Sequence, residues 1–224
     1  AFQHAPAVEA NLLNYLWPLL IVLLSPLLIS GASLHLHHLL GALLGLLGAG
    51  LIVTGGNIGL DVVHLPGYLM AAGAAFVWAS YSLLTKRVAP FPTAAVAGFC
   101  AVSGALSLGL FFLSNPPGEA WRALQLSASD WVFLLLLGFG PMGSAFFTWD
   151  AALKRGDPRI IGSLTYLTPL LSTLWLVLLG GRAFTWVSAL AMALILAGAA
   201  IGSLDLWLGN AARGAQQSAS RRSR

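Results

Sequence analysis

The sequence is poor in charged residues, which make up 8% of its 224 positions, whereas hydrophobic residues make up 58%. Soluble domains carry about a quarter charged residues, so this deficit excludes an ordinary soluble domain and indicates a chain whose solvent is a lipid bilayer. The formal net charge of +4 does not indicate nucleic acid as a partner. The basic residues lie between apolar runs and in the tail, where membrane topology places them.

Cysteine and catalytic motifs are equally scarce. Cys100 is the single cysteine, which excludes a disulfide within the chain. The sequence holds no H-E-x-x-H motif, no P-loop and no coherent pair of nucleophile and base, so we predict no enzyme activity and no cofactor. The segment HLHH at 35–38 has no cysteine or acid beside it, and we therefore predict no metal site there.

What the sequence has in abundance is long apolar runs. Seven are long enough to cross about 30 Å of hydrocarbon as helices. They are continuous rather than alternating, which favours helices over the strands of a barrel. The predicted spans are 7–29, 34–54, 67–87, 93–113, 130–153, 158–180 and 185–208.

The basic residues predict how the spans are oriented. Loops on one side carry only Arg122 and Arg182, and the cytoplasmic side is predicted to be the one that is richer in positive charge. The C-terminus then lies in the cytoplasm, and the polar tail 209–224 is predicted to be disordered. The basic residues on that side are Lys86, Arg87, Lys154, Arg155, Arg159, Arg213, Arg221, Arg222 and Arg224.

A short motif occurs twice. NYLWPLL at 14–20 and TYLTPLL at 165–171 share Tyr-Leu-x-Pro-Leu-Leu, displaced by 151 positions, and a Gly/Ala-rich span follows each copy. Leucine-rich segments match by chance, but the shared tyrosine and proline favour a true repeat. The copies lie five spans apart, and an odd number of spans makes them antiparallel. This is the inverted repeat found in many secondary transporters.

The repeat predicts the domain organisation. Residues 65–208 form a complete unit of five helices, and residues 1–64 hold the last two helices of an earlier, incomplete unit. The predicted fold class is an all-α membrane protein, a 5+5 inverted-repeat helix bundle with ten helices, seven of them visible here. We accordingly expect three further helices in roughly 85 residues before Ala1.

Prolines, aromatics and amides inside the spans make up the candidate site. Pro18 and Pro169 each remove a backbone donor and favour a kink, so we predict that they act as hinges. Trp78, Tyr81 and Ser82 fall on one continuous face of a helix. Helix packing or anchoring at the membrane interface is the alternative role for each of these residues. The predicted substrate-binding residues are Asn14, Tyr15, Trp17, Trp78, Tyr81, Ser82 and Tyr166.

Other residues are interpreted as structural. Glu9 is expected to be a capping or interface residue rather than a proton or substrate site, and Asp150 is expected to form an ion pair with Lys154 four positions later. Small residues spaced by four predict close helix contacts. These sets are Gly41, Gly45 and Ala49; Ala71, Ala75 and Ala79; Ala97, Ala101, Ala105 and Gly109; and Ala189, Ala193 and Ala197.

Four segments resemble a known family. AVEANLLNYLWP, FVWASYSLLTKR, FFTWDAALKRGD and TYLTPLLS are similar, in this order, to segments of the drug/metabolite transporter superfamily of the EamA type, and to its bacterial aromatic amino-acid exporters above all. The wider superfamily often carries Gly-Glu where this chain reads ISGAS and LGGRA. The resemblance implies an inner-membrane carrier that moves aromatic and other neutral amino acids outward.

The residues themselves agree with a neutral cargo. A zwitterion needs no full countercharge, since its ammonium can lie over an aromatic ring and its carboxylate can accept N–H groups. The expected partners are the lipid bilayer and an amino acid, either aromatic or threonine or methionine, with the protein as a monomer. The alternatives are a carrier of other small neutral metabolites or drugs, a seven-helix receptor and an intramembrane enzyme. A retinal pigment is disfavoured, because 185–208 contains no lysine.

Overall fold

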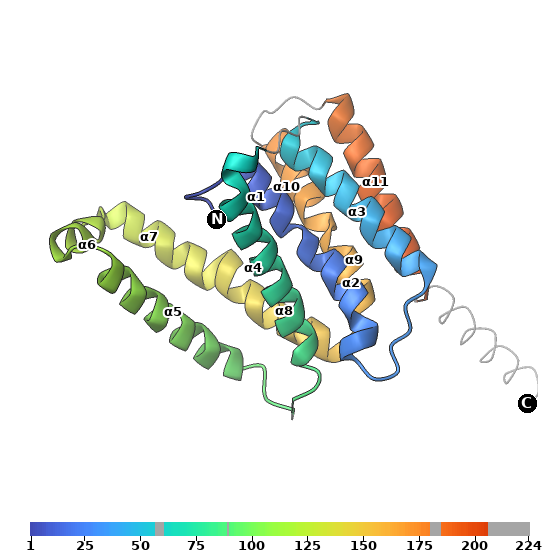
Figure 1. Cartoon of the computed structure of the whole chain (residues 1–224), viewed down its shortest axis with the longest axis horizontal. Helices are drawn as coiled ribbons and strands as arrows, with labels where there is room; N and C mark the ends of the chain where they lie inside the picture. The colour runs from blue at the N-terminus through green and yellow to red at the C-terminus, as the bar shows by residue number, and fades with distance from the viewer. Residues whose placement is uncertain (57–60, 89, 180–184, 206–224) are drawn as a thin grey trace, which may run out of the picture. The chain divides into compact units, whose positions relative to one another are not determined.

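The computed structural model describes residues 1–56, 61–88, 90–179 and 185–205 (Figure 1). The tail 209–224 and the end of the last predicted span lie outside the described residues. Every regular element in the described part of the chain is helical. The chain divides into two compact units, Ala1–Val88 with Gly156–Arg224 as unit 1, and Ala89–Arg155 as unit 2.

Unit 1 is built from two broken helices and three continuous ones, with a short 3-10 turn before α4. The broken helices are α1–α2 and α9–α10, and the continuous ones are α3, α4 and α11. The bounds are α1 Ala7–Asn14, α2 Leu16–Leu28, α3 Leu36–Thr54, η1 Val62–His64, α4 Leu65–Leu84, α9 Pro158–Thr165, α10 Leu167–Leu178 and α11 Trp186–Gly202.

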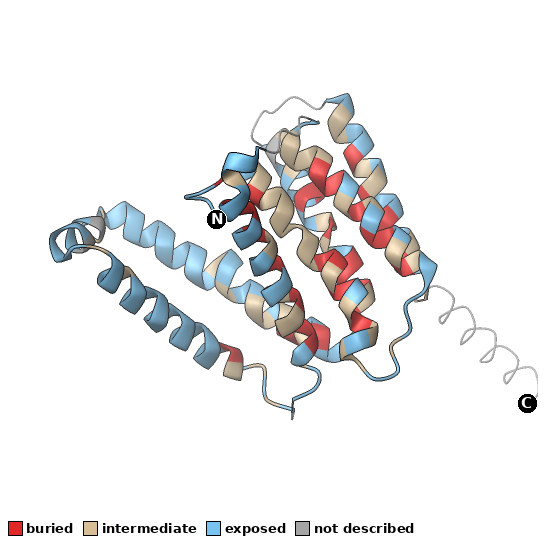
Figure 2. Ribbon diagram, viewed as in Figure 1, coloured by how far each residue is buried: buried red, intermediate tan, exposed pale blue. Residues whose placement is uncertain are grey.

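The core of unit 1 contains buried residues of α2, α3, α10 and α11, and within it α3 packs extensively against α11 (Figure 2). The two helices are antiparallel, and glycines allow their backbones to touch. A Cβ added at Gly41 would lie 2.5 Å from Cα of Gly202, and one at Gly198 would lie 2.6 Å from the carbonyl oxygen of Gly41. Such an approach is typical of small-residue contacts between membrane helices.

Small-residue spacing predicted only part of this contact. Gly41, Gly45 and Ala49 of α3 are buried as expected. The prediction for α11 was wrong, because Ala189, Ala193 and Ala197 are exposed in the described chain. The buried face of α11 instead contains Ala191, Ile195, Gly198 and Gly202. The sequence of α11 places small residues on several faces, so their spacing does not select one.

Unit 2 contains one continuous helix, a short connecting helix and a kinked helix. The predicted connection around SNPPGEA forms α6, which the sequence did not predict. The predicted span 130–153 is interrupted at Gly140, whose φ of −83° and ψ of −115° are not helical, and Pro141 follows. The bounds are α5 Ala95–Ser114, α6 Pro117–Ala123, α7 Ala128–Leu137, η2 Gly138–Met142 and α8 Gly143–Arg155.

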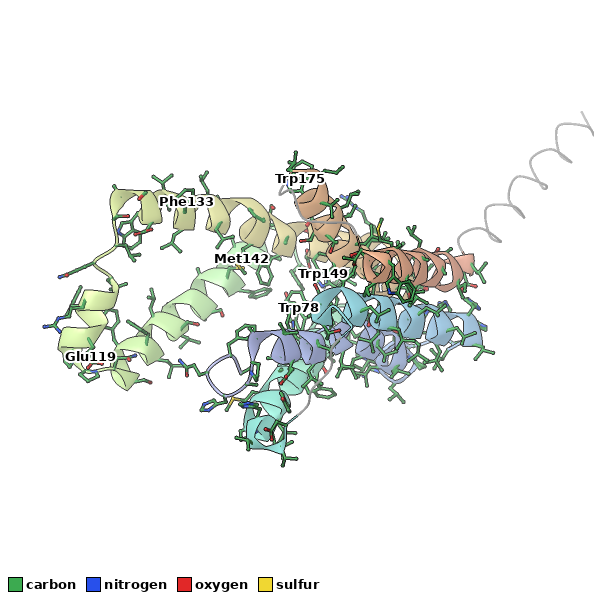
Figure 3. All side chains as sticks on the ribbon, turned by 90° about the horizontal axis from the view of Figure 1, so that it is seen from above. Trp78, Glu119, Phe133, Met142, Trp149 and Trp175 are labelled. Atoms are coloured by element: carbon green, nitrogen blue, oxygen red, sulfur yellow. The ribbon has the colours of Figure 1, made fainter. Side chains whose placement is uncertain are left out.

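Most side chains of unit 2 are exposed (Figure 2). Phe133 on α7 is 67% exposed and points outward among the side chains drawn in Figure 3. An exposed surface this apolar is expected where lipid or another membrane helix covers it.

Within the described ranges, five helical stretches are long and apolar enough to cross a membrane: Ala7–Leu28, Leu36–Thr54, Val62–Leu84, Ala95–Ser114 and Ala128–Arg155. α11 is apolar but shorter. The sixth predicted span, 158–180, coincides with α9 and α10, so each of the seven predicted runs is mainly helical where the structure describes it, apart from breaks and run ends.

Candidate functional site: the paired helix breaks and the aromatic cluster

The two broken helices are interrupted at equivalent residues of the repeated motif. α1 ends and α2 begins around Tyr15, and α9 ends and α10 begins around Tyr166. In each case a proline lies three positions later, and proline has no N–H to donate to the carbonyl one turn before it. Those carbonyls belong to Asn14 and Thr165, the last residues of α1 and α9. The same sequence therefore produces the same break twice.

A hydrogen bond joins the two breaks. The hydroxyl of Tyr166 donates to the backbone carbonyl of Tyr15 at 3.0 Å. The two chain segments run in opposite directions through unit 1, with α2 beside α9 (Figure 1). Residues at corresponding places in the two copies of the motif thus meet directly inside the unit.

Tyr166 is a core residue in this structure. Its side chain has no exposed surface and packs with Leu19, Val22 and Leu170. Gly45 of α3 leaves room for the ring, since a Cβ there would overlap it. In the described conformation the ring of Tyr166 is packed in the core and its hydroxyl is bonded to Tyr15. Its predicted contact with substrate stays a prediction.

Three aromatic side chains predicted for the site do lie together. The rings of Trp17 from α2 and Trp78 from α4 meet edge to face, with centroids 6.2 Å apart. Tyr81 stands one turn further along α4, with its ring centroid 5.7 Å from that of Trp78. All three side chains are half-buried, and Trp78 is labelled in Figure 3. Half-exposed aromatic faces can receive an apolar ring or a cationic ammonium.

We define the aromatic cluster as Trp17, Trp78 and Tyr81, and the structure places the other predicted residues as follows. Asn14 and Tyr15 are half-buried at the break between α1 and α2. Ser82 is buried, and its hydroxyl donates to the carbonyl of Trp78 at 2.8 Å within α4. Pro18 and Pro169 are both buried.

Glu9 connects two helices rather than capping its own. Its carboxylate accepts a hydrogen bond from the hydroxyl of Tyr68 on α4, and that hydroxyl accepts the backbone N–H of Asp61 at 3.3 Å. The N-cap of α1 is Pro6, without a side-chain hydrogen bond. The capping role expected for Glu9 is therefore not supported, and its contact with α4 was not predicted. Tyr68 was missed, because a tyrosine near the start of a span is usually an interfacial anchor.

The predicted ion pair in unit 2 is confirmed. Lys154 Nζ lies 2.6 Å from the buried carboxylate of Asp150 on the same helix. The ammonium also donates to the carbonyl of Phe91 at 2.8 Å and lies 4.1 Å from the centroid of the Phe91 ring. Lys154 therefore contacts the Asp150 carboxylate, the Phe91 carbonyl and the Phe91 ring, and we interpret its role as structural.

Basic residues of unit 1 gather at one end, as the charge distribution predicted. Lys86 donates to the carbonyl of Gly156 at 2.7 Å, and Arg87 donates to the carbonyls of Leu27 and Leu28 at the end of α2. Arg159 forms an ion pair with Asp157 at 2.5 Å and donates to the carbonyl of Ser33. Lys86 and Arg87 thus bind carbonyls at the C-terminal ends of helices, where the helix dipole favours positive charge. Arg159 lies in the first turn of α9, where the carboxylate of Asp157 balances its charge.

A pocket of about 220 Å³ opens at this end, between Lys86, Arg159 and the loop at Ser30–Ala32. Burial lowers the pKa of the Lys86 ammonium, and the charge of Asp157 opposes that shift only in part. Burial alone would raise the pKa of Asp157, but hydrogen bonds and charge attraction from Arg159 outweigh it and hold that pKa below its usual value. The ion pair of Asp157 and Arg159 therefore stays charged at neutral pH.

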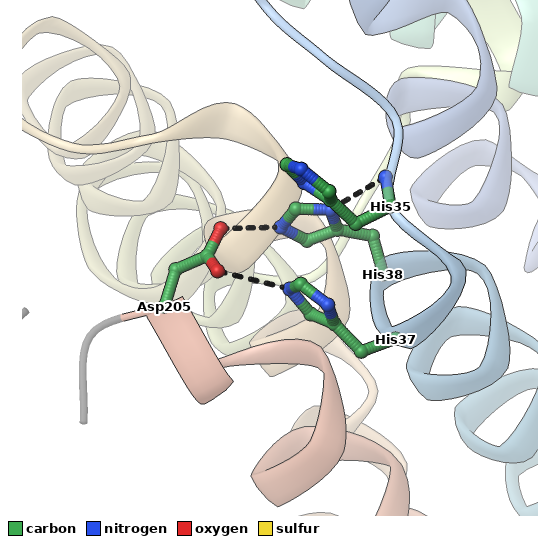
Figure 4. Close-up of side chains that lie close together, drawn as sticks. All are labelled: His35, His37, His38 and Asp205. Atoms are coloured by element: carbon green, nitrogen blue, oxygen red, sulfur yellow. Dashed lines mark hydrogen bonds and ion pairs between the residues drawn. The ribbon is translucent and has the colours of Figure 1, made fainter. Parts of the chain in front are cut away.

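One cluster was missed by the sequence analysis. His37 and His38 at the start of α3 each lie 3.1 Å from an oxygen of Asp205, which follows α11, and His35 lies beside them (Figure 4). The sequence had excluded a metal site here for want of a neighbouring acid. No local signal identifies Asp205 as that neighbour, because the packing of α3 on α11 brings it there.

Comparisons with known proteins agree on one family. The model of the EamA-like transporter family matches residues 65–204. The aromatic amino acid exporter YddG of Ancylobacter novellus is 44% identical over 206 residues, which cover 91% of this chain and 69% of that protein. The YddG exporter of Escherichia coli K12 is 29% identical and covers 77% of this chain.

A third relative and a solved structure extend this result. The YddG exporter of Salmonella typhimurium is 27% identical over 90% of this chain. A solved crystal structure matches with a TM-score of 0.81 and 43% sequence identity, covering 91% of this chain and 70% of the other. The chain spans 69%, 59% and 67% of the lengths of the three exporters.

Proposed function

Because the chain belongs to the EamA-like transporter family, we propose that it forms part of a secondary transporter that exports aromatic and other neutral amino acids across the bacterial inner membrane. Membership of this family makes the protein a multi-pass membrane transporter rather than an enzyme. The cargo is proposed from the three relatives named as aromatic amino acid exporters and from the aromatic cluster.

The aromatic cluster is the observation that carries the proposal. Trp17, Trp78 and Tyr81 present half-buried ring faces beside the break at Tyr15. We propose that they receive the side chain or the ammonium of the amino acid, and that Asn14 and the backbone at the break bind its polar groups. No full countercharge is required for a zwitterion, and the three rings supply none.

Alternating access is proposed to use the paired breaks. We infer that residues 1–64 and 65–208 belong to two inverted five-helix repeats, with Pro18 and Pro169 as hinges in corresponding helices. Support comes from the equivalent breaks at Tyr15 and Tyr166 and from the opposite directions of the segments that contain them. Orientation with the basic end of unit 1 in the cytoplasm follows the positive-inside rule and is part of the same proposal.

The test is flux into or out of liposomes that contain the protein expressed from its complete gene. We expect saturable flux of labelled phenylalanine, competed by threonine or methionine if the cargo range is broad. Substituting Trp17→Ala or Trp78→Ala should reduce flux at least tenfold, since each removes a ring from the cluster. Trp186→Ala is the matched control, because Trp186 is 74% exposed at the start of α11.

Two results would contradict the proposal. Flux equal to that of empty liposomes, with protein shown to be folded by gel filtration, would reject an amino-acid carrier. Equal losses in the Trp186 variant and in the Trp17 and Trp78 variants would remove the aromatic cluster from the site. A carrier of other small neutral metabolites is the second candidate, and a competition panel of uncharged solutes distinguishes it from an amino-acid exporter.

A further inference from the structure

Three histidines and an aspartate converge at one end of unit 1, apart from the proposed transport site. His35 is the N-cap residue of α3, and His37 and His38 lie in its first turn. Asp205 follows the end of α11 and approaches Nε2 of both His37 and His38 to 3.1 Å (Figure 4). One ligand atom from each of the four side chains lies within 4.8 Å of all the others.

We propose that His35, His37, His38 and Asp205 bind a divalent transition-metal cation, with Zn²⁺ as the best match. Imidazole nitrogens and a carboxylate oxygen are ligands that Zn²⁺ prefers, and four of them complete a tetrahedral site. Zn²⁺ bonds of about 2.0–2.1 Å place neighbouring ligand atoms about 3.3 Å apart. The two contacts at 3.1 Å already match this spacing, and small rotations of the side chains bring the remaining atoms in.

The buried nitrogens of this cluster favour a shared cation over simple pairing. Nε2 of His37 and Nε2 of His38 are buried and make no hydrogen bond of good geometry. Both lie close to Asp205, so the distance is suitable for an interaction but the direction of the ring N–H is not. A cation placed between the three groups would be a partner for both nitrogens and for the carboxylate at once.

All three histidines lie at the N-terminal end of α3, where the helix dipole opposes a positive charge, so a cation bound here requires a nearby carboxylate. The charge of Arg159 also acts on His38, and the charge of Asp157, the ion-pair partner of Arg159, acts in the opposite sense. Asp205 therefore supplies the negative charge of the site.

Binding would require one rearrangement. The backbone N–H of His35 donates to Nδ1 of His38 at 3.3 Å, which places the proton of that ring on Nε2. Coordination through Nε2 moves this proton to Nδ1 and gives up the hydrogen bond. That bond is longer than the usual range for backbone N–H donors, so losing it costs little.

The experiment is calorimetric titration of Zn²⁺ into the complete protein, purified in detergent without a histidine tag and stripped with EDTA. We expect one Zn²⁺ per chain and a rise in Tm that EDTA reverses. His35→Gln and Asp205→Asn should each weaken binding at least about tenfold. His35 is exposed, so its substitution removes a ligand with little risk to folding.

His4 and His64 provide the matched controls, because both are histidines outside the cluster. His4→Gln and His64→Gln should bind Zn²⁺ like the unmodified protein. Absence of saturable binding at one ion per chain would overturn the proposal and leave the cluster as ion pairs between α3 and α11. Binding unaffected by His35→Gln and Asp205→Asn would also overturn it. The inference does not depend on amino-acid transport, since its readouts are heat and Tm.

Discussion

The contact between α3 and α11 makes a quantitative prediction about Gly198. A methyl group at this position would lie 2.6 Å from the carbonyl oxygen of Gly41 and 2.7 Å from the backbone N of Gly45. Both atoms belong to the backbone of α3 and cannot rotate away. To reach ordinary contact near 3.4 Å, the helices must separate by about 0.8 Å, a gap that forfeits a quarter to a half of the dispersion attraction along the interface.

The expected cost of Gly198→Ala is about 2–3 kcal/mol, in the range of overpacked cores. For a chain of this size that cost corresponds to a fall in Tm of roughly 4–12 °C. The assay is the fraction of protein that remains monodisperse by gel filtration after heating in detergent. Gly73→Ala is the matched control, because a Cβ at Gly73 of α4 meets nothing within 4 Å. Its Tm should stay the same or rise slightly, since alanine favours a helix.

A double variant makes the test stricter. Gly41 faces Gly198 and Gly202 across the same interface, so Gly41→Ala alone should also lower Tm. Once one methyl group has separated the helices, the second costs less, and the double variant should lose less than the two single losses combined. An unchanged Tm for Gly198→Ala, or an equal fall for Gly73→Ala, would refute the packing that we describe.

Three further predictions concern the breaks and the basic end of unit 1. Tyr166→Phe removes the hydrogen bond to the carbonyl of Tyr15 and should cost about 1 kcal/mol, a fall of roughly 2–4 °C in Tm by the same assay. Pro18→Ala restores a donor for the carbonyl of Asn14, so Tm should hold while phenylalanine flux falls severalfold; unchanged flux would contradict the hinge role. The pKa of Asp157 is lower in the folded state than in the unfolded chain, so its contribution to stability is full above about pH 4 and is lost as pH falls further. Tm measured from pH 6 to pH 3 should fall less steeply in Asp157→Asn than in the unmodified protein, and parallel curves would contradict this assignment.

Hydropathy and the repeated motif predicted much of the fold for a clear physical reason. A bilayer requires long apolar helices, so composition alone located the runs that become α3, α4 and α5. Proline acts locally, so Pro18 and Pro169 predicted where the helices break. Trp78 and Tyr81 were placed on one face by helical spacing, and that face is where Trp17 meets Trp78.

The sequence did not predict the features that depend on how the helices pack against one another. Gly41 and Gly45 on α3 determine which face of α11 is buried. Because α11 carries small residues on several faces, its own sequence does not identify that face. Asp205 reaches the histidines at the start of α3 through this same packing. Tyr166 illustrates the limit for single residues, because the motif marks it as special but does not distinguish a ring that binds cargo from one that fills the core.

The bond from Tyr166 to the carbonyl of Tyr15 gives the two halves of unit 1 a common joint. A change at either break would have to carry this hydrogen bond along or break it, at a cost of about 1 kcal/mol. In the proposed alternating-access mechanism, the bond would therefore couple the movements of the two copies of the motif while one side of the membrane opens and the other closes.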